Sequence, residues 1–506
     1  MADSQHFDLI IIGGGPAGYV GAIRASQMGM KVACVDRGKL GGVCLNWGCI
    51  PSKSLLANAE LVEKLHHADD WGVSFDHLTI NWEKVIGRSR GVADKLNKGI
   101  EFLFKKNKVT HFDSHAKVVS GATGGNKPTV ELYDCDLQET LTHAPCEVKD
   151  KVQTITADNI IIATGSVARD LPFARFDGDK IIGAREAMTL PTQPKKLIVV
   201  GAGAIGIEFA YFYHAYGTEV TVVEMMDHIL PVEDADISKA IEKIYKKSGM
   251  NIKTKTTVTN VEKTADGVKV TVAPFVDGKA DESKAETLEA DKVLLAIGVK
   301  GRYDGLFDES LGIETVRDHI KTDYVPGEAE PKALTYATSV PGIYAVGDVI
   351  GAPWLAHVAS EEAILCVERI AGHDPIPMDY SVIPGCTYCH PQVASVGFTE
   401  AALIASGLKK GEDYEVGSYN LLAHGKAIAA GHNVGMVKII KGLPRGEILG
   451  AHILGDQATE LIAELTLARR LEATTEELNA TVHAHPTMHE AVGEAAMAAE
   501  GKLIHG

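Results

Sequence analysis

Residues 7–37 read FDLIIIGGGPAGYVGAIRASQMGMKVACVDR, a stretch in which an apolar strand, a glycine-rich turn, a helical pattern and a second strand follow one another. The strand at 7–12 runs into GxGxxG at 13–18, and the second strand, at 31–35, ends at Asp36. The three glycines allow a tight turn, close approach of the backbone to a pyrophosphate, and close packing of helix on strand. The helix N-terminus can then hold phosphates, and the acid can accept a hydrogen bond from a ribose hydroxyl. This order of elements predicts a dinucleotide-binding fold.

The same unit occurs a second time in the chain. A strand at 196–200 leads into GAGAIG at 201–206, and the strand GTEVTVVE ends at Glu224. From the first glycine to the acid is 23 residues in both copies. The chain therefore binds two dinucleotides, or one dinucleotide beside a decayed copy. Glu224 favours NAD over NADP, because a carboxylate would repel a 2′-phosphate and the stretch 225–231 offers no arginine to accommodate one.

Three further segments fit a doubly wound sheet. The runs DNIIIATGS (158–166) and DKVLLAIGV (291–299) are typical of buried strands closed by a glycine turn. PGIYAVGDV (341–349) places Asp348 just beyond a strand, where an acid can take a sugar hydroxyl. We expect an α/β protein.

Size and composition restrict the class of protein. The 506 residues are too many for one ordinary core and suggest three or four domains. Hydrophobic residues make up 45% and charged residues 23%, as in a soluble globular protein. The net charge of −17 argues against nucleic acid and anionic membranes as partners. No apolar run reaches membrane-spanning length, and the start MADSQHFDLI lacks the features of a signal peptide, so we expect a cytoplasmic protein.

A pair of cysteines stands in the segment LGGVCLNWGCIPSK, residues 40–53. Cys44 and Cys49 are separated by four residues, and the apolar run that follows indicates a helix start, where the helix dipole lowers a thiol pKa. This spacing is compatible with a zinc site, a structural disulfide and a redox-active pair. Eight cysteines in 506 residues do not make a disulfide scaffold, so catalytic or metal-binding roles come before a structural one.

Taken together, the motifs resemble a known family. GGGPAG, GGVCLNWGCIPSK, ATGS, GAGAIGIE, PGIYAVGDV and HAHPTMHE occur in the order seen in the FAD-dependent pyridine nucleotide–disulfide oxidoreductases, and the resemblance covers nearly the whole chain. It implies two Rossmann-like domains and a C-terminal α+β dimerisation domain. The expected limits are an FAD-binding domain at 1–157, an NAD-binding domain at 158–298, a central domain completing the FAD site at 299–377, and an interface domain at 378–506.

The resemblance also implies an activity. The chain is most similar to members that oxidise the dihydrolipoyl arm of 2-oxo acid dehydrogenase or glycine cleavage complexes and reduce NAD. Such a protein would dock on lipoyl domains and on the core of its complex. Glutathione, trypanothione and mercuric reductases are the alternatives, and Glu224 and the lack of any cysteine beyond 389 argue against them. A non-enzymatic scaffold that retains the fold is a third hypothesis.

Residue roles follow from the same resemblance. Cys44 is the thiol that exchanges with substrate, and Cys49 passes electrons to the flavin. Lys53 is the cation near the flavin ring, paired with a glutamate of the second fold. His485 and Glu490 are the base and its orienting acid, contributed by the other subunit, so that each active site of the homodimer is shared. The residues assigned to cofactor binding are Gly13, Gly15, Gly18, Asp36, Arg37, Gly42, Lys53, Ala116, Thr164, Gly165, Asp348, Ala356, Gly201, Gly203, Gly206, Glu208, Glu224, Val258 and Gly298.

One motif points elsewhere. Cys386-x-x-Cys389-His390 matches the attachment pattern of c-type haem, which requires export to a compartment with the attachment machinery. Without an export segment we do not expect haem, and a second redox pair or a metal site stays open. No metal ligand is assigned. The role of Trp47, between the first two cysteines, also stays open.

Overall fold

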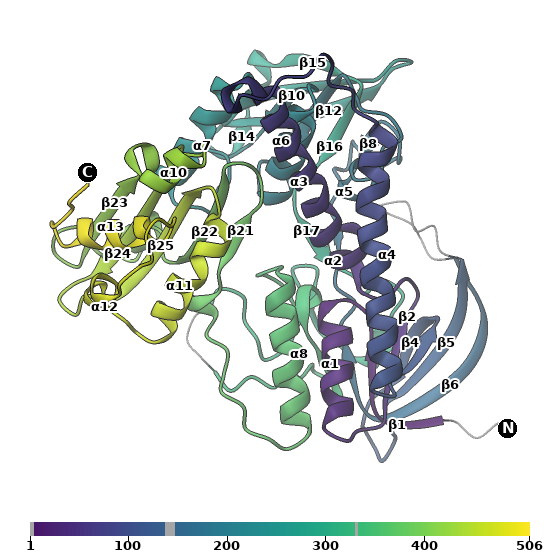
Figure 1. Cartoon of the computed structure of the whole chain (residues 1–506). Helices are drawn as coiled ribbons and strands as arrows, with labels where there is room; N and C mark the ends of the chain where they lie inside the picture. The colour runs from purple at the N-terminus through teal and green to yellow at the C-terminus, as the bar shows by residue number, and fades with distance from the viewer. Residues whose placement is uncertain (1–4, 137–146, 329–331, 506) are drawn as a thin grey trace.

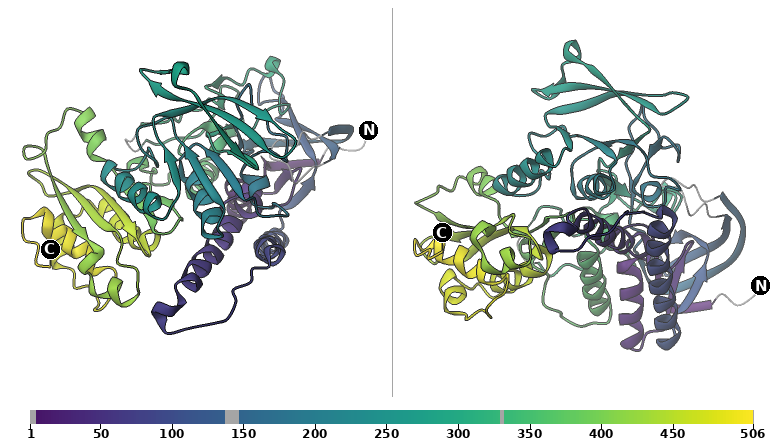
Figure 2. Two further views of the ribbon diagram at one scale, coloured as in Figure 1. Left: turned by 90° about the horizontal axis from the view of Figure 1, so that it is seen from above. Right: turned by 45° about the horizontal axis from the view of Figure 1, so that its top comes forward.

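The computed structural model describes residues 5–136, 147–328 and 332–505 (Figure 1). Two sheets built mainly of parallel strands, called the two parallel sheets below, carry helices on their faces, and in the first of them β4 and β5 run antiparallel. With one antiparallel sheet near the C-terminus they account for most of the chain, which confirms the predicted fold class. In Figure 2 the C-terminal part, in green and yellow, lies to one side of the two parallel sheets. No helix within the described ranges is both long and apolar enough to cross a membrane.

The first sheet is built around the strand at the start of the chain. Its strand order is β3-β2-β1-β6-β5-β4, with β20 beside β6. The apolar strand β1 is parallel to both β2 and β6, and its side chains from Leu9 to Ile12 are buried because helices cover both faces. The strands are β1 (Gln5–Ile12), β2 (Val32–Asp36), β3 (Thr110–Asp113), β4 (His115–Ser120), β5 (Thr129–Asp136), β6 (Glu147–Ile162) and β20 (Ile343–Ala345). The helices around it are α1 (Pro16–Gln27), α2 (Gly42–Trp47), α3 (Cys49–His66), α4 (Trp82–Lys106) and α8 (Ala356–Ile370).

The second sheet repeats the pattern with the parallel order β11-β10-β9-β16-β8. The chain thus contains two folds of one kind, as the equal glycine-to-acid spacing predicts. Its elements are β8 (Ile181–Ile182), α5 (Ala184–Ala187), β9 (Lys196–Val200), α6 (Ala204–Ala215), β10 (Glu219–Val223), α7 (Ala235–Lys247), β11 (Asn251–Lys253) and β16 (Lys292–Leu295). An antiparallel excursion joins β11 to β16 through β12 (Thr256–Lys263), β13 (Val268–Val276), β14 (Lys279–Ala280) and β15 (Glu286–Ala290).

Two short antiparallel strand pairs form small sheets of their own. Their members are β7 (Ser166–Ala168) with β17 (Val299–Gly301), and β18 (Thr315–Val316) with β19 (His319–Ile320). The strand β6 runs through the predicted domain limit at 157/158, and β20, from the predicted central domain, pairs with β6 in the first sheet. The division into domains stays a prediction.

The C-terminal part is an antiparallel sheet of order β21-β22-β25-β24-β23. The helices α11 and α13 pack on its strands and bury an apolar core. The strands are β21 (Gly385–Thr387), β22 (Gln392–Gly397), β23 (Tyr414–Asn420), β24 (Met436–Gly442) and β25 (Ile448–Gly455). The helices are α9 (Glu400–Ala405), α10 (Gly425–Ala429), α11 (Ala458–Arg470), α12 (Thr475–Ala480) and α13 (Glu490–Ala499).

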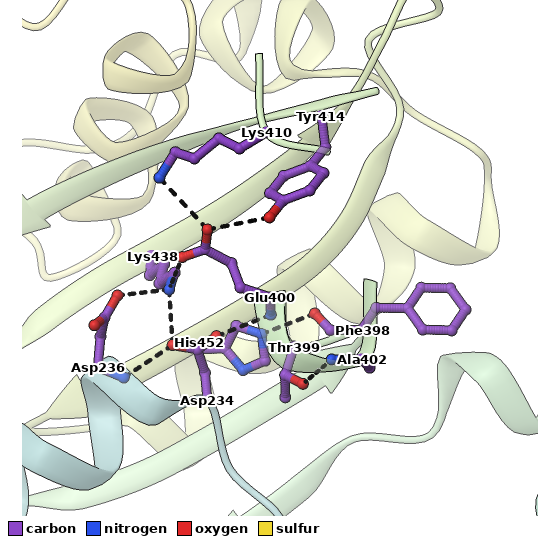
Figure 3. Close-up of polar contacts among 10 residues, drawn as sticks. All are labelled: Asp234, Asp236, Phe398, Thr399, Glu400, Ala402, Lys410, Tyr414, Lys438 and His452. Carbon is purple, nitrogen blue, oxygen red and sulfur yellow. Dashed lines mark hydrogen bonds and ion pairs between the residues drawn. The ribbon is translucent and has the colours of Figure 1, made fainter. Parts of the chain in front are cut away.

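A buried lysine joins this sheet to helix α7 of the second fold (Figure 3). Lys438 of β24 is 1% exposed, and its ammonium lies 2.7 Å from Asp234, 2.6 Å from Asp236 and 2.5 Å from Glu400. Burial lowers the pKa of Lys438, but hydrogen bonds to the three carboxylates raise it by more than burial lowers it. The net pKa is therefore above its ordinary value. The lysine therefore stays charged and neutralises acids from α7 and α9.

Replacement of Lys438 by methionine should destabilise the protein by about 3–5 kcal/mol, because the Asp234 carboxylate, which is 2% exposed, then remains buried without its cation. Urea denaturation of the cofactor-loaded protein measures the loss. Lys410→Met is the matched control: its ammonium pairs with Glu400 at 3.4 Å but is 54% exposed, and we expect a change of at most about 1 kcal/mol. Equal effects of the two substitutions would contradict the role given to Lys438.

Candidate active site

The two thiols of segment 40–53 lie at the junction of two helices. Cys44 is in the short helix α2, and Cys49 is the first residue of α3. Between them the helix is interrupted at Gly48, which has φ −151° and ψ −115°. Both side chains are half-buried, and the sulfurs are not bonded to each other, so this is the dithiol form. The Cys44 thiol donates a hydrogen bond to the sulfur of Cys49.

The hydrogen bond makes the two thiols unequal acids. It lowers the pKa of Cys49 to about 7; burial opposes this, and the positive charge of Lys53 adds to the lowering. The same hydrogen bond, together with burial, raises the pKa of Cys44 well above the ordinary thiol value. Near neutral pH the pair therefore holds one proton on Cys44 and presents Cys49 as a thiolate.

The rate of alkylation of Cys49 by iodoacetamide should rise with pH through a midpoint near 7, because only the thiolate reacts and its pKa lies at about 7 rather than 9. The experiment uses the reduced protein, and peptide mapping by mass spectrometry follows each cysteine. Cys386 is the internal control, since burial raises its pKa to about 11 and its midpoint should move in the opposite direction. A midpoint for Cys49 at or above 9 would contradict this assignment.

A buried ion pair stands beside the thiols. Lys53, one turn after Cys49 on α3, has its ammonium 3.0 Å from both carboxylate oxygens of Glu208 on α6. The Glu208 side chain is 9% exposed and also accepts a 2.9 Å hydrogen bond from the backbone N–H of Tyr388. The Lys53 ammonium lies 4.3 Å from the centre of the Tyr388 ring. The predicted pairing of Lys53 with Glu208 is present, and it fixes a positive charge next to Cys49.

At the first glycine turn the backbone lies so close to neighbouring backbone that no side chain would fit. A Cβ at Gly13, where φ is +107°, would lie 2.2 Å from the carbonyl oxygen of Ala163. A Cβ at Gly42, at the start of α2, would lie 2.6 Å from the Cα of Gly15. Gly18 packs inside α1 against the carbonyl of Gly13. The turn at 13–18 and the start of α2 therefore approach each other with bare backbone, as a phosphate-binding turn requires.

The two predicted ribose acids occupy equivalent places. Asp36 ends β2 and accepts a hydrogen bond from the backbone N–H of Gly14 in the first turn. Glu224 follows β10 and accepts from the N–H of Ala202 in the second turn at 2.7 Å, and from the N–H of Met226 at 2.8 Å. Each carboxylate is thus held at the mouth of its glycine turn, and burial raises the pKa of Asp36 above its ordinary value.

Further residues predicted for the first site lie around the end of β6. The hydroxyl of Thr164 is buried and has no hydrogen-bond partner among the described residues. Asp348 is partly buried beyond β20 and accepts a 2.6 Å hydrogen bond from Ser166. The others are Arg37, hydrogen-bonded to His115 at 3.4 Å, Ala116, buried in β4, Gly165, after Thr164, and Ala356, the first residue of α8. An unpaired buried hydroxyl beside a bare phosphate-binding turn fits FAD.

The second turn repeats the geometry of the first. A Cβ at Gly201 would lie 2.4 Å from the carbonyl oxygen of Ala296. The other predicted residues of this site are Gly203, directly before α6, Gly206, within α6, Val258, buried in β12, and Gly298, after β16. A dinucleotide fits here for the same reason as in the first fold.

The predicted base and its acid form a pair on the surface. Nδ1 of His485 lies 2.8 Å from Glu490, the first residue of α13, and Glu490 also accepts a 2.9 Å hydrogen bond from the N–H of Thr487. The His485 side chain is 81% exposed. None of the hydrogen bonds or ion pairs of the described residues joins His485 to either thiol, and Figure 1 places α13 and α2 in different parts of the chain. One chain alone does not bring the base to the thiols.

Two residues of the site, Trp47 and Arg302, could not be given a role from the sequence. The Trp47 ring lies between the guanidinium groups of Arg90 and Arg185, each 4.8 Å from its centre. Arg302 is partly buried at the first site, where its backbone N–H donates to the carbonyl of Gly165, and burial followed by the charges of nearby arginines lowers its pKa to about 10. Both depend on partners from distant segments, so no local pattern could have found them.

Comparisons with known proteins agree with this geometry. The family model described as pyridine nucleotide-disulphide oxidoreductase matches residues 7–363, and the model of its dimerisation domain matches residues 383–496. The chain is 44% identical to a dihydrolipoyl dehydrogenase of Rhizobium etli and 41% identical to one of Zymomonas mobilis, with all of both chains covered in each case. It is 39% identical to a mitochondrial dihydrolipoyl dehydrogenase of Pisum sativum, over 99% of this chain and 93% of that one.

A solved structure is similar over almost the same extent. The crystal structure of LpdA from Mycobacterium tuberculosis superimposes with a TM-score of 0.83 at 26% identity. The match covers 97% of this chain and 99% of that chain. The arrangement of the two parallel sheets and the antiparallel sheet is therefore that of a known fold.

Proposed function

The chain belongs to the pyridine nucleotide–disulphide oxidoreductase family, and we propose that it works as a dihydrolipoyl dehydrogenase with FAD and NAD as its cofactors. The reaction converts a dihydrolipoyl dithiol and NAD⁺ into the lipoyl disulfide, NADH and one proton. The observation that carries the proposal is the pair Cys44 and Cys49, held beside the Lys53–Glu208 ion pair between two dinucleotide folds.

The thiol chemistry follows from the unequal acidity of the pair. In the oxidised protein Cys44 and Cys49 share a disulfide, and a substrate thiolate attacks the sulfur of Cys44. Cys49 leaves as the thiolate, and its lowered pKa makes it the better leaving group. The second substrate thiol then displaces Cys44, which takes a proton, and the substrate leaves as a disulfide. When bound, FAD supplies the two-electron carrier between this dithiol and the nicotinamide of NAD.

Proton transfer is the role of the exposed histidine. Only a thiolate attacks a disulfide, so a base must take the proton of the substrate thiol. Glu490 holds Nδ1 of His485, which leaves Nε2 free to accept that proton. The match to the family's dimerisation domain makes the protein a homodimer, and we place His485 of one subunit against the thiols of the other. The 81% exposure of His485 in a single chain supports this arrangement.

Lys53 and Glu224 complete the site. The Lys53 ammonium, fixed by Glu208, stabilises negative charge on Cys49 and on a neighbouring group that receives its electrons. The Glu224 carboxylate, held by two backbone N–H groups, accepts from the ribose hydroxyls of NAD and repels the 2′-phosphate of NADP.

Steady-state kinetics test the proposal directly. The purified protein should reduce NAD with dihydrolipoamide at least about 100-fold faster than it reduces oxidised glutathione with NADPH, a difference of about 2.7 kcal/mol in activation free energy. Absorbance at the NADH and NADPH band measures both reactions. Faster turnover of glutathione, or equal use of NADP and NAD with dihydrolipoamide, would overturn it.

The partners and the location follow from the same activity. We place the homodimer on a 2-oxo acid dehydrogenase or glycine cleavage complex, where lipoyl domains bring the dithiol to the active site. The bacterial relatives support a cytoplasmic location.

A further inference from the structure

Three potential metal ligands from separate segments meet outside the redox site. Glu60 lies in the second half of α3, His390 in the turn between β21 and β22, and Asp456 directly after β25. One ligand atom of each lies within 4.8 Å of the corresponding atoms of the other two. All three side chains are partly buried. One imidazole and two carboxylates thus converge from the first parallel fold and the C-terminal sheet.

A second imidazole borders the same place. The rings of His390 and His432 meet edge to face, with centres 5.0 Å apart. Within the described part of the chain neither ring makes a hydrogen bond, although His390 is partly buried. A cavity of about 520 Å³ opens beside the two rings, lined by Glu60, Glu63, His67 and Asp70 among others. There is room for an ion and its water ligands.

The groups around His390 suit ligation. The carboxylates of Glu60 and Asp456 face its ring, and neither ring nitrogen makes a hydrogen bond within the described residues, so the imidazole is open to a cation. One competitor is present: the Lys64 ammonium lies 2.6 Å from an oxygen of Glu60, but its side chain is 44% exposed and can turn away.

We propose that Glu60, His390 and Asp456, with His432 as a fourth ligand, bind a divalent transition-metal cation of the Zn²⁺ type. Imidazole nitrogen and carboxylate oxygen are ligands that Zn²⁺ accepts, at about 2.0–2.2 Å. Ligand atoms in such a tetrahedral site lie about 3.4 Å apart, so ligand atoms within 4.8 Å of one another need to close by at most about 1.4 Å. The neighbouring Cys389 is not part of the set, because its thiol donates to the carbonyl of Pro391 at 3.3 Å.

The site would fasten α3 to the C-terminal sheet. Glu60 is 11 residues beyond Cys49, about 16 Å along the helix, so the metal does not reach the thiols. Its role is structural: bound metal holds the far end of the helix that begins at Cys49. The inference does not depend on the proposed activity.

Isothermal titration of the FAD-loaded protein with Zn²⁺ tests the site, in a Cys44→Ser/Cys49→Ser background so that the redox thiols cannot bind the metal. We expect one zinc per subunit. In both His390→Ala and Asp456→Asn the affinity for zinc should fall by more than about 100-fold. Substitutions of residues that only support the ligands typically cost roughly 10- to 100-fold. Saturating zinc should also raise the midpoint of thermal unfolding of the Cys44→Ser/Cys49→Ser protein. It should leave the midpoint unchanged when His390→Ala or Asp456→Asn is added.

Three further variants sharpen the result. His67→Ala removes an imidazole that lines the same cavity outside the cluster, and zinc affinity should stay within about twofold. Lys64→Met removes the competing ammonium, so affinity should rise. Glu60→Gln repeats the ligand test without disturbing the turn at His390. Absence of zinc binding, binding that survives loss of both His390 and Asp456, or an equal loss in His67→Ala would overturn the proposal.

Discussion

Replacing Cys44 by serine lowers kcat/KM for NAD reduction by dihydrolipoamide by at least about 1,000-fold, which corresponds to about 4 kcal/mol of transition-state stabilisation. The hydroxyl can still donate the hydrogen bond to Cys49, but an oxygen cannot form the disulfide that substrate must attack. Steady-state assays at saturating NAD measure the loss, and the flavin absorbance of the variant confirms that the cofactor is retained.

Cys386→Ser is the control for this substitution. Cys386 is also half-buried and has a raised pKa, but it lies in β21, and no hydrogen bond of the described residues joins its thiol to Cys44 or Cys49. Its replacement should leave kcat/KM within about twofold of the wild type. Activity of Cys44→Ser above a hundredth of the wild-type value would contradict the exchange role of Cys44.

His485→Gln should lower kcat/KM by about 10²- to 10⁴-fold, because the amide cannot take a proton from the substrate thiol. The loss should shrink as the pH rises, since at higher pH the substrate ionises without help. His489→Gln, in the same segment and 46% exposed, is the control and should keep activity within about twofold. Equal losses in the two histidine variants would contradict the assignment of the base.

Mixed dimers separate a shared site from one built within a single chain. If His485 acts on the thiols of the partner, a dimer of Cys44→Ser with His485→Gln contains one intact site. Subunit exchange of the two inactive variants should then restore about a quarter of the wild-type activity, because about half of the dimers are mixed and half of their sites are intact. No recovery after exchange, checked by tagged subunits, would place the base and the thiols in the same chain.

Much of the fold could be predicted because its signals are local. Each dinucleotide fold is marked by a glycine turn and an acid 23 residues further on, and the structure places both Asp36 and Glu224 on N–H groups of their own turns. The pairing of Lys53 with Glu208 is different. The two residues are 155 positions apart, and only the family resemblance pointed to it.

What the sequence did not predict depends on contacts between distant segments. Lys438 and Asp234 are 204 positions apart, and nothing near either residue marks a buried ion cluster. Glu60 and His390 meet only because α3 packs beside the turn before β22. The motif at 386–390 suggested haem, a redox pair or a metal, and its histidine is the residue that the structure brings to two carboxylates. Trp47 likewise finds its two arginines on α4 and α5.

The Glu208 carboxylate has a consequence for movement during turnover. It accepts hydrogen bonds from α3 and from the backbone before β22 while standing on α6, so three parts of the chain converge on a single side chain. Movement of the NAD-binding fold away from the rest of the chain would separate the Glu208 carboxylate from Lys53 and from the N–H of Tyr388. We therefore expect nucleotide exchange without a hinge opening at α6, and the radius of gyration in solution should be the same with and without NAD.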